Sequence, residues 1–315
     1  MSIYANEKGI NSTEKLFRNQ DLKKMLIPLI IEQILVMLVG IADTIMVSYA
    51  GEAAISGVAL VDMINYLVST VFAAIATGGA VVVSQYLGNK ESDHAKCAAS
   101  QLLLISLLIA LVVTIFCLAF HNGILKILFG SVESDVMQAS IIYFVITTMS
   151  FPFLSIYNSC AALFRSMQKT NVTMNVSIIM NGINLVGNAI GIFVMKAGVS
   201  GVAVPTLIAR MVAALLMLVL SLQGKNQVSV SFQNIFSWNK NMVTRILRVA
   251  VPNGIENGMF ALGKVIVVSI IALFGTSQIA ANGVANSIDQ VAVIVVNAWQ
   301  PSAHLSWQTL SPYRR

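Results

Sequence analysis

The stretch MLIPLIIEQILVMLVGIADTIMVS, residues 25–48, decides the fold. It is almost entirely apolar, and its only ionisable side chains are Glu32 and Asp43. A hydrocarbon layer about 30 Å thick is crossed by about 20 such residues in helical conformation. The stretch therefore predicts a transmembrane helix, and its two acids need an explanation because charge in hydrocarbon is costly.

Seven further apolar stretches follow the first, so the sequence predicts an all-α membrane protein. The composition agrees, since 57% of the residues are hydrophobic and only 10% are charged, against about 25% charged in ordinary soluble domains. The first span is expected to serve as an uncleaved anchor, because no signal peptide is visible. The predicted spans are residues 25–48, 53–87, 97–120, 137–164, 172–195, 202–222, 249–274 and 279–297.

The basic residues are distributed unequally between the two sides of the membrane. With a cytoplasmic N-terminus, fifteen of the 19 Lys and Arg residues fall on the cytoplasmic side. Lys126 and Lys196 face outward, and Arg210 and Lys264 lie within spans. This is the positive-inside pattern. We therefore expect a plasma-membrane protein with its N-terminus in the cytoplasm, and we attribute the net charge of +6 to topology and not to nucleic-acid binding.

An internal repeat divides the chain into two units. An offset of 224 residues aligns Pro28 with Pro252, Glu32 with Glu256, Gly51 with Gly275 and Ile55 with Ile279. Both copies start on the same side, so the repeat is expected to be parallel. The predicted organisation is a cytoplasmic N-terminal segment (1–22), a six-helix N-lobe (23–222), a cytoplasmic linker (223–248), a partial C-lobe of two helices (249–297) and an aberrant polar tail (298–315).

The shortness of the second unit and the composition of the tail favour a C-terminally truncated product. A repeat of the first unit would require six helices, and the chain supplies two. From residue 297 onward the sequence holds two of the three Trp residues and two of the six Pro residues. A naturally short polar C-terminus is the alternative. The activity of a truncated product is in question.

Polar side chains inside the spans are the candidate site residues. Glu32 and Asp43 are eleven residues apart and return to nearly the same helix face. Asp62, two turns into the next span, is expected to share an outer cavity with Asp43. Asn184 and Asn188 lie one turn apart in the fifth span, where such amides line a cavity or bond neighbouring helices. Both readings stay open, as does a purely structural role for the acids.

The seventh span carries the remaining candidates. Glu256 follows Pro252, which frees a backbone carbonyl, and is a candidate for binding the coupling ion or the substrate. Lys264 is expected to form a structural ion pair with an acid of another helix. Arg210, in the sixth span, is expected to snorkel or to pair with an acid. No His lies near an Asp, Glu or Cys at ligand spacing, so no metal or catalytic site is predicted.

The segment GIADTIMV, residues 40–47, resembles the multidrug and toxic compound extrusion (MATE) transporters. The likeness continues through SQYLG (84–88), NLVGN (184–188) and GVSGVAVPT (198–206). It implies two six-helix lobes around a central cavity, and export of organic cations and other amphiphiles in exchange for H⁺ or Na⁺. It also implies that Asp43 is the coupling carboxylate of the N-lobe, with Asn184 and Asn188 beside it.

Two residues depart from the family pattern. Many members have Asp where this chain has Asn188, which puts a proton relay of two carboxylates in question, and Gly where it has Ser48. An acid on the seventh helix of other members has Glu256 as its only counterpart here.

The function expected from these observations is a cation-coupled antiporter that exports organic cations or drugs. H⁺ or Na⁺ would be the coupling ion, with no other cofactor. The partners would be small organic cations or amphiphiles and the lipid bilayer, and the protein would be a monomer. Two alternatives remain, a lipid-linked oligosaccharide flippase of related architecture and a polytopic membrane enzyme or scaffold. A flippase would be expected to have a more cationic cavity, whereas the N-lobe is biased toward acids.

Overall fold

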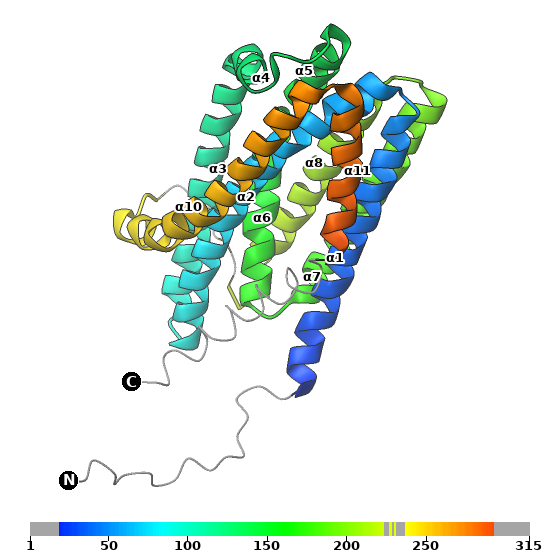
Figure 1. The fold of residues 1–315 in the computed structure, drawn as a ribbon. Coiled ribbons are helices and arrows are strands. Elements are labelled where there is room, and N and C mark those ends of the chain that lie inside the picture. The colour runs from blue at the N-terminus through cyan, green and yellow to red at the C-terminus, as the bar shows by residue number, and fades with distance from the viewer. Residues whose placement is uncertain (1–18, 224–226, 229, 231–236, 293–315) are drawn as a thin grey trace, which may run out of the picture.

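The structure is a computed structural model that describes residues 19–223, 227–228, 230 and 237–292, with side chains from Ile27 onward except at 287 and 290–292. Most of the predicted N-terminal segment and the whole predicted tail lie outside the described residues. Within them, every regular element is a helix, and Figure 1 shows the helices assembled into one elongated bundle. The helices are α1 (Asn19–Ser48), α2 (Glu52–Gly88), α3 (Ser92–Ala119), α4 (His121–Phe129), α5 (Ser134–Met149), α6 (Phe151–Ser166), α7 (Thr170–Ala189), the π-helix η1 (Ile190–Val194), α8 (Ser200–Leu222), α10 (Lys240–Ile271), the 3₁₀-helix η2 (Ala272–Phe274) and α11 (Thr276–Ala292).

Helix α2 forms the centre of the bundle. It packs against α3, α5, α6, α10 and α11, so its buried residues extend around much of its circumference. Glycines permit the closest approaches. A Cβ atom on Gly57 would lie 2.9 Å from Ala139 Cβ of α5, and one on Gly79 would lie 2.4 Å from Leu102 Cδ1 of α3. Small residues at helix contacts are typical of packing inside membranes, where backbones approach each other closely.

The contact of α2 with α10 and α11 joins the two repeat units, and we call it the seam. Where the two long helices cross, a Cβ atom on Gly78 would lie 2.6 Å from Ala250 Cβ and 2.7 Å from Ala250 Cα. In α11, a Cβ atom on Gly283 would lie 3.0 Å from Ala59 Cβ. At these two crossings the seam is therefore built from small side chains and backbone.

The turns before α2 and α11, at the two aligned glycines of the predicted repeat, share one conformation. Gly51 has φ 107° and ψ 165°, and Gly275 has φ 113° and ψ 172°. Residues with a Cβ atom rarely adopt these angles. Each glycine carbonyl accepts the first helical hydrogen bond, from Ile55 N at 3.2 Å and from Ile279 N at 3.3 Å.

The two turns also contact each other. Ser277 Oγ donates to Glu52 Oε1 at 2.7 Å, and Ser56 Oγ donates to the carbonyl of Thr276 at 3.1 Å. We call this side of the bundle the Gly51 end. The opposite side, where α1 and α7 begin and α2 and α6 end, is the Asn19 end.

The predicted fold class is confirmed, with corrections to individual spans. Six helices are long and apolar enough to cross a membrane, and a bent pair raises the number to seven. That pair is the predicted span 137–164, which consists of α5 and α6 with a bend of 48°. Pro152, the second residue of α6, fits the first turn of a new helix, where its missing N–H needs no partner. Helix α11 has only 17 residues, and positions 293–297 of its predicted span lie outside the described residues.

Helix α10 begins inside the predicted linker. Asn239 Oδ1 accepts a hydrogen bond from Met242 N at 3.1 Å and so caps the helix that starts at Lys240. Such a cap satisfies one of the backbone donors left free in the first turn. The polar residues that suggested a linker up to 248 therefore include the first turns of α10.

Candidate functional site

Asp43 lies on the face of α1 that packs against α7, toward the Gly51 end. Its side chain is half-buried, and its Oδ1 accepts a hydrogen bond from Asn188 Nδ2 at 2.7 Å. Asn188 is fully buried, and its own Oδ1 has no hydrogen-bond partner among the described residues. The carboxylate is thus held by an amide from the neighbouring helix.

The amide of Asn184 completes the contact and can serve Asp43 in two ways. One amide atom lies 3.0 Å and 3.2 Å from the two carboxylate oxygens, and the other lies 2.9 Å from Thr206 Oγ1 of α8. With its nitrogen toward Asp43, Asn184 donates to the ionised carboxylate. With its oxygen toward Asp43, it can accept a hydrogen bond from the protonated acid, because an amide carries both a donor and an acceptor.

No basic side chain neutralises Asp43 among the described residues. The two ion pairs within that part of the chain are Lys96 with Asp93 and Arg165 with Glu32. A carboxylate placed in a membrane without a cationic partner marks an ion or substrate pathway. The partners of Asp43 within that part of the chain are therefore amides.

Asp62 of α2 forms the second acidic position of this region. It lies close enough to Asp43 for the two carboxylates to repel each other. Its Oδ1 accepts from Asn65 Nδ2 at 3.4 Å, and the hydroxyl of Tyr143 hydrogen-bonds to it. Arg210 attracts it electrostatically without forming an ion pair within 4.0 Å. Asp62 is therefore near enough to influence Asp43, and the outer cavity shared by the two acids stays a prediction.

Arg210 is held at the bend between α5 and α6. Its Nη1 donates to Ser150 Oγ at 2.7 Å, and Ser150 is the residue that separates the two helices. The Ser150 hydroxyl at the bend is therefore a hydrogen-bond acceptor for the guanidinium of Arg210.

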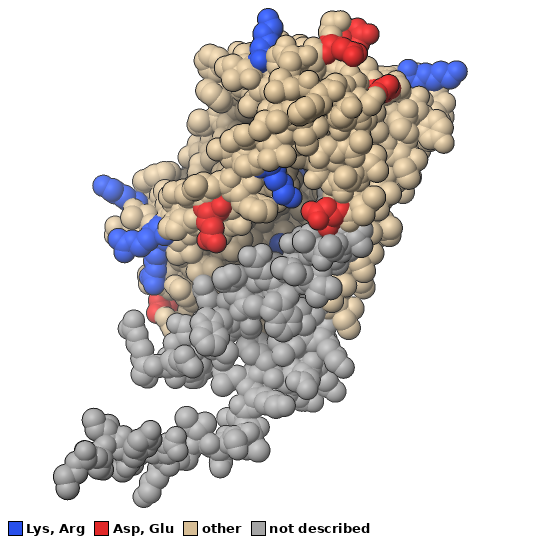
Figure 2. Space-filling model, in the orientation of Figure 1, with Lys and Arg blue, Asp and Glu red and all other residues tan. Residues whose placement is uncertain are grey.

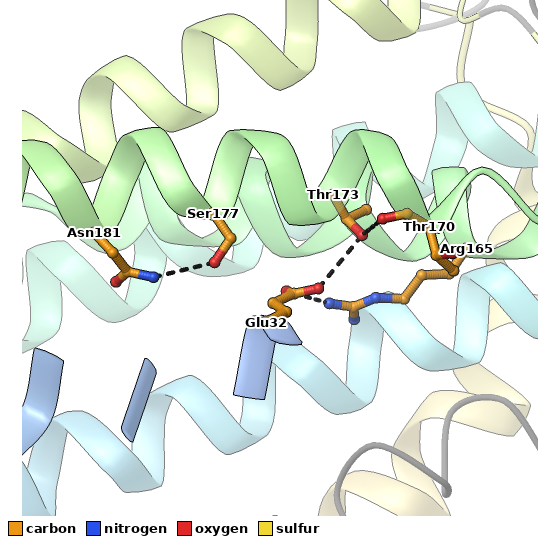
Figure 3. A network of polar contacts seen from close by, with 6 residues as sticks. All are labelled: Glu32, Arg165, Thr170, Thr173, Ser177 and Asn181. Atoms are coloured by element: carbon orange, nitrogen blue, oxygen red, sulfur yellow. Dashed lines mark hydrogen bonds and ion pairs between the residues drawn. The ribbon is translucent and has the colours of Figure 1, made fainter. Parts of the chain in front are cut away.

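Glu32 belongs to a different cluster at the Asn19 end (Figure 3). Its Oε1 accepts from Arg165 Nη2 at 2.8 Å, and its Oε2 accepts from Thr173 Oγ1 of α7 at 3.4 Å. Glu32 and Asp43 both face α7, as the eleven-residue spacing suggests, but they have different partners. Arg165 lies in the last turn of α6 and was expected among the cytoplasmic charges, yet its side chain turns inward to the acid.

Glu256 and Lys264 lie apart from Asp43, on α10. Glu256 is exposed and has no hydrogen bond or ion pair within the described residues. The ion pair expected for Lys264 does not form there either. Its Nζ lies 5.3 Å from the ring centroid of Tyr66 and 5.5 Å from that of Phe260, so aromatic faces replace the expected acid.

The structure therefore assembles part of the predicted site. Asp43, Asn184 and Asn188 are in direct contact, with Asp62 nearby, while Glu32 and Glu256 are elsewhere. Thr206 was not predicted as a hydrogen-bond partner of Asn184, although it is the last residue of the GVSGVAVPT motif. Within the described residues, no group of three or more His, Cys, Asp and Glu side chains could hold a metal ion.

Comparisons with known proteins agree with this architecture. The MatE family model matches residues 28–190, just over half of the chain. The uncharacterized transporter YisQ of Bacillus subtilis is 28% identical over 257 residues, covering 80% of this chain and 56% of that protein. The probable multidrug resistance protein NorM of Thermotoga maritima is 24% identical over 287 residues, covering 87% of this chain and 59% of that protein. The chain thus spans less than two thirds of the length of these relatives.

A solved structure shows the same fold. The crystal structure of MATE in the straight conformation superposes with a TM-score of 0.79 at 20% identity, over 92% of this chain and 64% of that one.

Proposed function

The chain belongs to the MatE family, and from this premise we propose that it is a cation-coupled antiporter that exports organic cations and related amphiphiles. H⁺ or Na⁺ would be the coupling ion. The observation that carries the proposal is Asp43, a carboxylate between α1 and α7 that has amide partners and no basic partner among the described residues.

The proposed orientation places the Asn19 end in the cytoplasm and the protein in the plasma membrane. The unequal distribution of Lys and Arg supports it, since helix termini at the Asn19 end carry Lys90, Arg165 and Lys169, whereas Lys126 and Lys196 lie toward the Gly51 end. Figure 2 shows that most of the visible surface of the described residues is uncharged. Asp43 would then lie in the outer half of the membrane.

In the proposed mechanism, Asp43 is one negative site for which the coupling ion and a cationic substrate compete. The Asn184 amide hydrogen-bonds the carboxylate when its nitrogen faces Asp43 and the neutral acid when its oxygen does. For Na⁺, the oxygens of Asp43, Asn184, Asn188 and Thr206 are the available ligands. Either cation removes the charge, and the change in contacts between α1 and α7 favours release of substrate to the outside.

The test is dye efflux from liposomes that contain the chain. Ethidium, a fluorescent organic cation, would be extruded when a proton or sodium gradient is imposed. Asp43→Asn should abolish gradient-driven efflux, because the amide can neither be protonated at neutral pH nor neutralise a cation. Asp93→Asn is the matched control, since the side chain of Asp93 is 99% exposed on α3. The gradient that drives efflux identifies the coupling ion.

Two results would contradict the proposal. One is the absence of efflux by the unmodified chain under both gradients, and the other is normal efflux by Asp43→Asn. An Asn184→Leu variant adds a finer measurement, because Leu offers neither hydrogen bond. Coupling should weaken by about tenfold or more, since one charge-assisted hydrogen bond contributes about 1.5–3 kcal/mol.

The relatives do not favour the flippase, and the names of those with an assigned role describe transporters or multidrug resistance proteins. We therefore propose no second function.

A further inference from the structure

A pocket of about 460 Å³ lies between α2, α10 and α11, away from Asp43. Figure 2 shows it as a hollow in the middle of this face, with a blue side chain in it. Most of its wall is apolar, and the polar side chains that line it within the described part of the chain are one ammonium and two amides, with no carboxylate. Its volume is within the range of about 300–1,000 Å³ that holds a small organic molecule. The residues used below are Met63, Met259, Phe260, Lys264, Asn282 and Asn286.

Among the described residues, Lys264 provides the only charge in the lining. Its Nζ contacts the faces of Tyr66 and Phe260, and no acid lies within 4.0 Å of it among the described residues. A cation at membrane depth costs several kcal/mol, and each aromatic face returns about 0.5–2 kcal/mol. The pocket therefore retains positive charge that a ligand can neutralise.

The amides of α11 add hydrogen-bonding groups to the same pocket. Asn282 and Asn286 are one helical turn apart and both line it. Asn286 Nδ2 donates to the carbonyl of Asn282 at 2.9 Å, whereas the Asn282 amide has no partner within the described part of the chain. An ammonium and an amide donor that line one pocket can bind an oxyanion together.

We propose that this pocket binds the anionic group of an amphiphile, with a carboxylate, sulfonate or phosphate on Lys264 and Asn282. The apolar body would lie against Met63, Met259 and Phe260. Met side chains adapt to ligands of different shape, so we expect the pocket to discriminate among ligands by their charge more strongly than by their shape. This assigns a second ligand class, distinct from the cation that Asp43 accepts, and goes beyond the proposed export of cations.

Two acids on the same helices define the competing interpretation. Asp289 lies one turn beyond Asn286 on α11, and Glu256 lies two turns before Lys264, about 12 Å away along α10. Neither forms an ion pair with Lys264 within the described residues. If one of them were the true partner of Lys264, no anion would be needed. The experiment must therefore separate an internal counter-ion from an external ligand.

The test uses three fluorescent probes that share one apolar group and differ in charge. Dansylglycine is anionic, dansylamide is neutral and dansylcadaverine is cationic. Binding is measured by fluorescence titration of the full chain in nanodiscs of phosphatidylcholine, with no ion gradient. Dansylglycine should bind at least about tenfold more tightly than dansylamide, as one charge-assisted contact implies. Dansylcadaverine should bind no better than dansylamide in this pocket.

The variants test the contribution of individual residues. Lys264→Gln should remove the preference for dansylglycine, and Lys264→Arg should restore most of it. Lys126→Gln, at an exposed position of α4, should change nothing. Asp289→Asn should leave the affinity for dansylglycine unchanged or raise it, because it removes a nearby negative charge. Thermal denaturation of each variant shows whether it is folded.

A lipid and a soluble ligand can supply the same anionic group, and a competition arm distinguishes them. Displacement of dansylglycine by phosphatidylglycerol, but not by phosphatidylcholine, would support the site with a lipid headgroup as its ligand. No displacement by phosphatidylglycerol would support it with a soluble ligand. Equal affinity for dansylglycine and dansylamide, or an unchanged preference in folded Lys264→Gln, would overturn the proposal. Because the assay needs no transport, its failure is distinct from failure of the efflux test.

Discussion

The ion pair between Glu32 and Arg165 yields an asymmetric prediction for stability. The side chain of Glu32 is 6% exposed and that of Arg165 is 23% exposed, at an N–O distance of 2.8 Å. We consider the two single changes to glutamine and the double change. Glutamine keeps most of the volume of either side chain and removes its charge. Differences in the free energy of unfolding between the variants therefore measure the loss of charge pairing.

The magnitudes follow from what each change leaves behind. Arg165→Gln leaves a buried carboxylate with Thr173 as its remaining partner, and an unpaired buried charge costs about 3–5 kcal/mol. Glu32→Gln leaves a guanidinium at the end of α6 whose flexible stem can carry it to the surface. We expect losses of about 3 kcal/mol for Arg165→Gln and about 1 kcal/mol for Glu32→Gln. The double variant should lose only about 1 kcal/mol, because no charge is left buried.

The measurement is equilibrium unfolding of the purified chain in mixed micelles with increasing fractions of sodium dodecyl sulfate, followed by circular dichroism. The double-mutant cycle isolates the coupling between the two side chains. Equal losses for the two single variants would contradict the argument from burial. Additive losses in the double variant would show that the two charges do not stabilise each other.

Two further predictions concern glycines, and both use the same unfolding measurement. Gly78→Ala should destabilise the chain by about 1–3 kcal/mol, because the new Cβ would overlap Ala250. Gly182→Ala is the control and should be neutral or stabilising, because a Cβ at that position meets nothing within 4 Å. An equal effect at both positions would refute the close contact at the seam. Gly51→Ala and Gly275→Ala should each cost about 1 kcal/mol or more, because φ is positive at both, and a loss at only one would contradict their equivalence.

The fold was largely predictable because hydrophobic length is a strong signal in membranes. The repeat found from Gly51 and Gly275 corresponds to one shared backbone conformation. The break between α5 and α6 was missed because hydropathy does not change across it. Pro152 was the available signal, since proline commonly occupies the first turn of a helix.

The candidate site was predictable only in part. The contact of Asp43 with Asn184 and Asn188 was predictable, because helix periodicity and family resemblance indicated the same helix faces. The partner of Glu32 was not predictable, since Arg165 follows it by 133 positions and its location near a helix end suggested solvent. Lys264 was expected to need an acid, and the structure supplies two aromatic rings. Which side chains meet across helices depends on packing that no local pattern encodes.

The crossing of Gly78 and Ala250 has a consequence for how the two repeat units can move. At that point main chain lies against main chain, and a rigid backbone cannot bend aside as a side chain does. If α10 slid along α2, Ala250 would meet residues of α2 that carry a Cβ atom, and these leave less space than Gly78 does. Rotation about the crossing requires no such collision. We therefore expect one unit to tilt against the other about this crossing, with the distance between the two helices unchanged there.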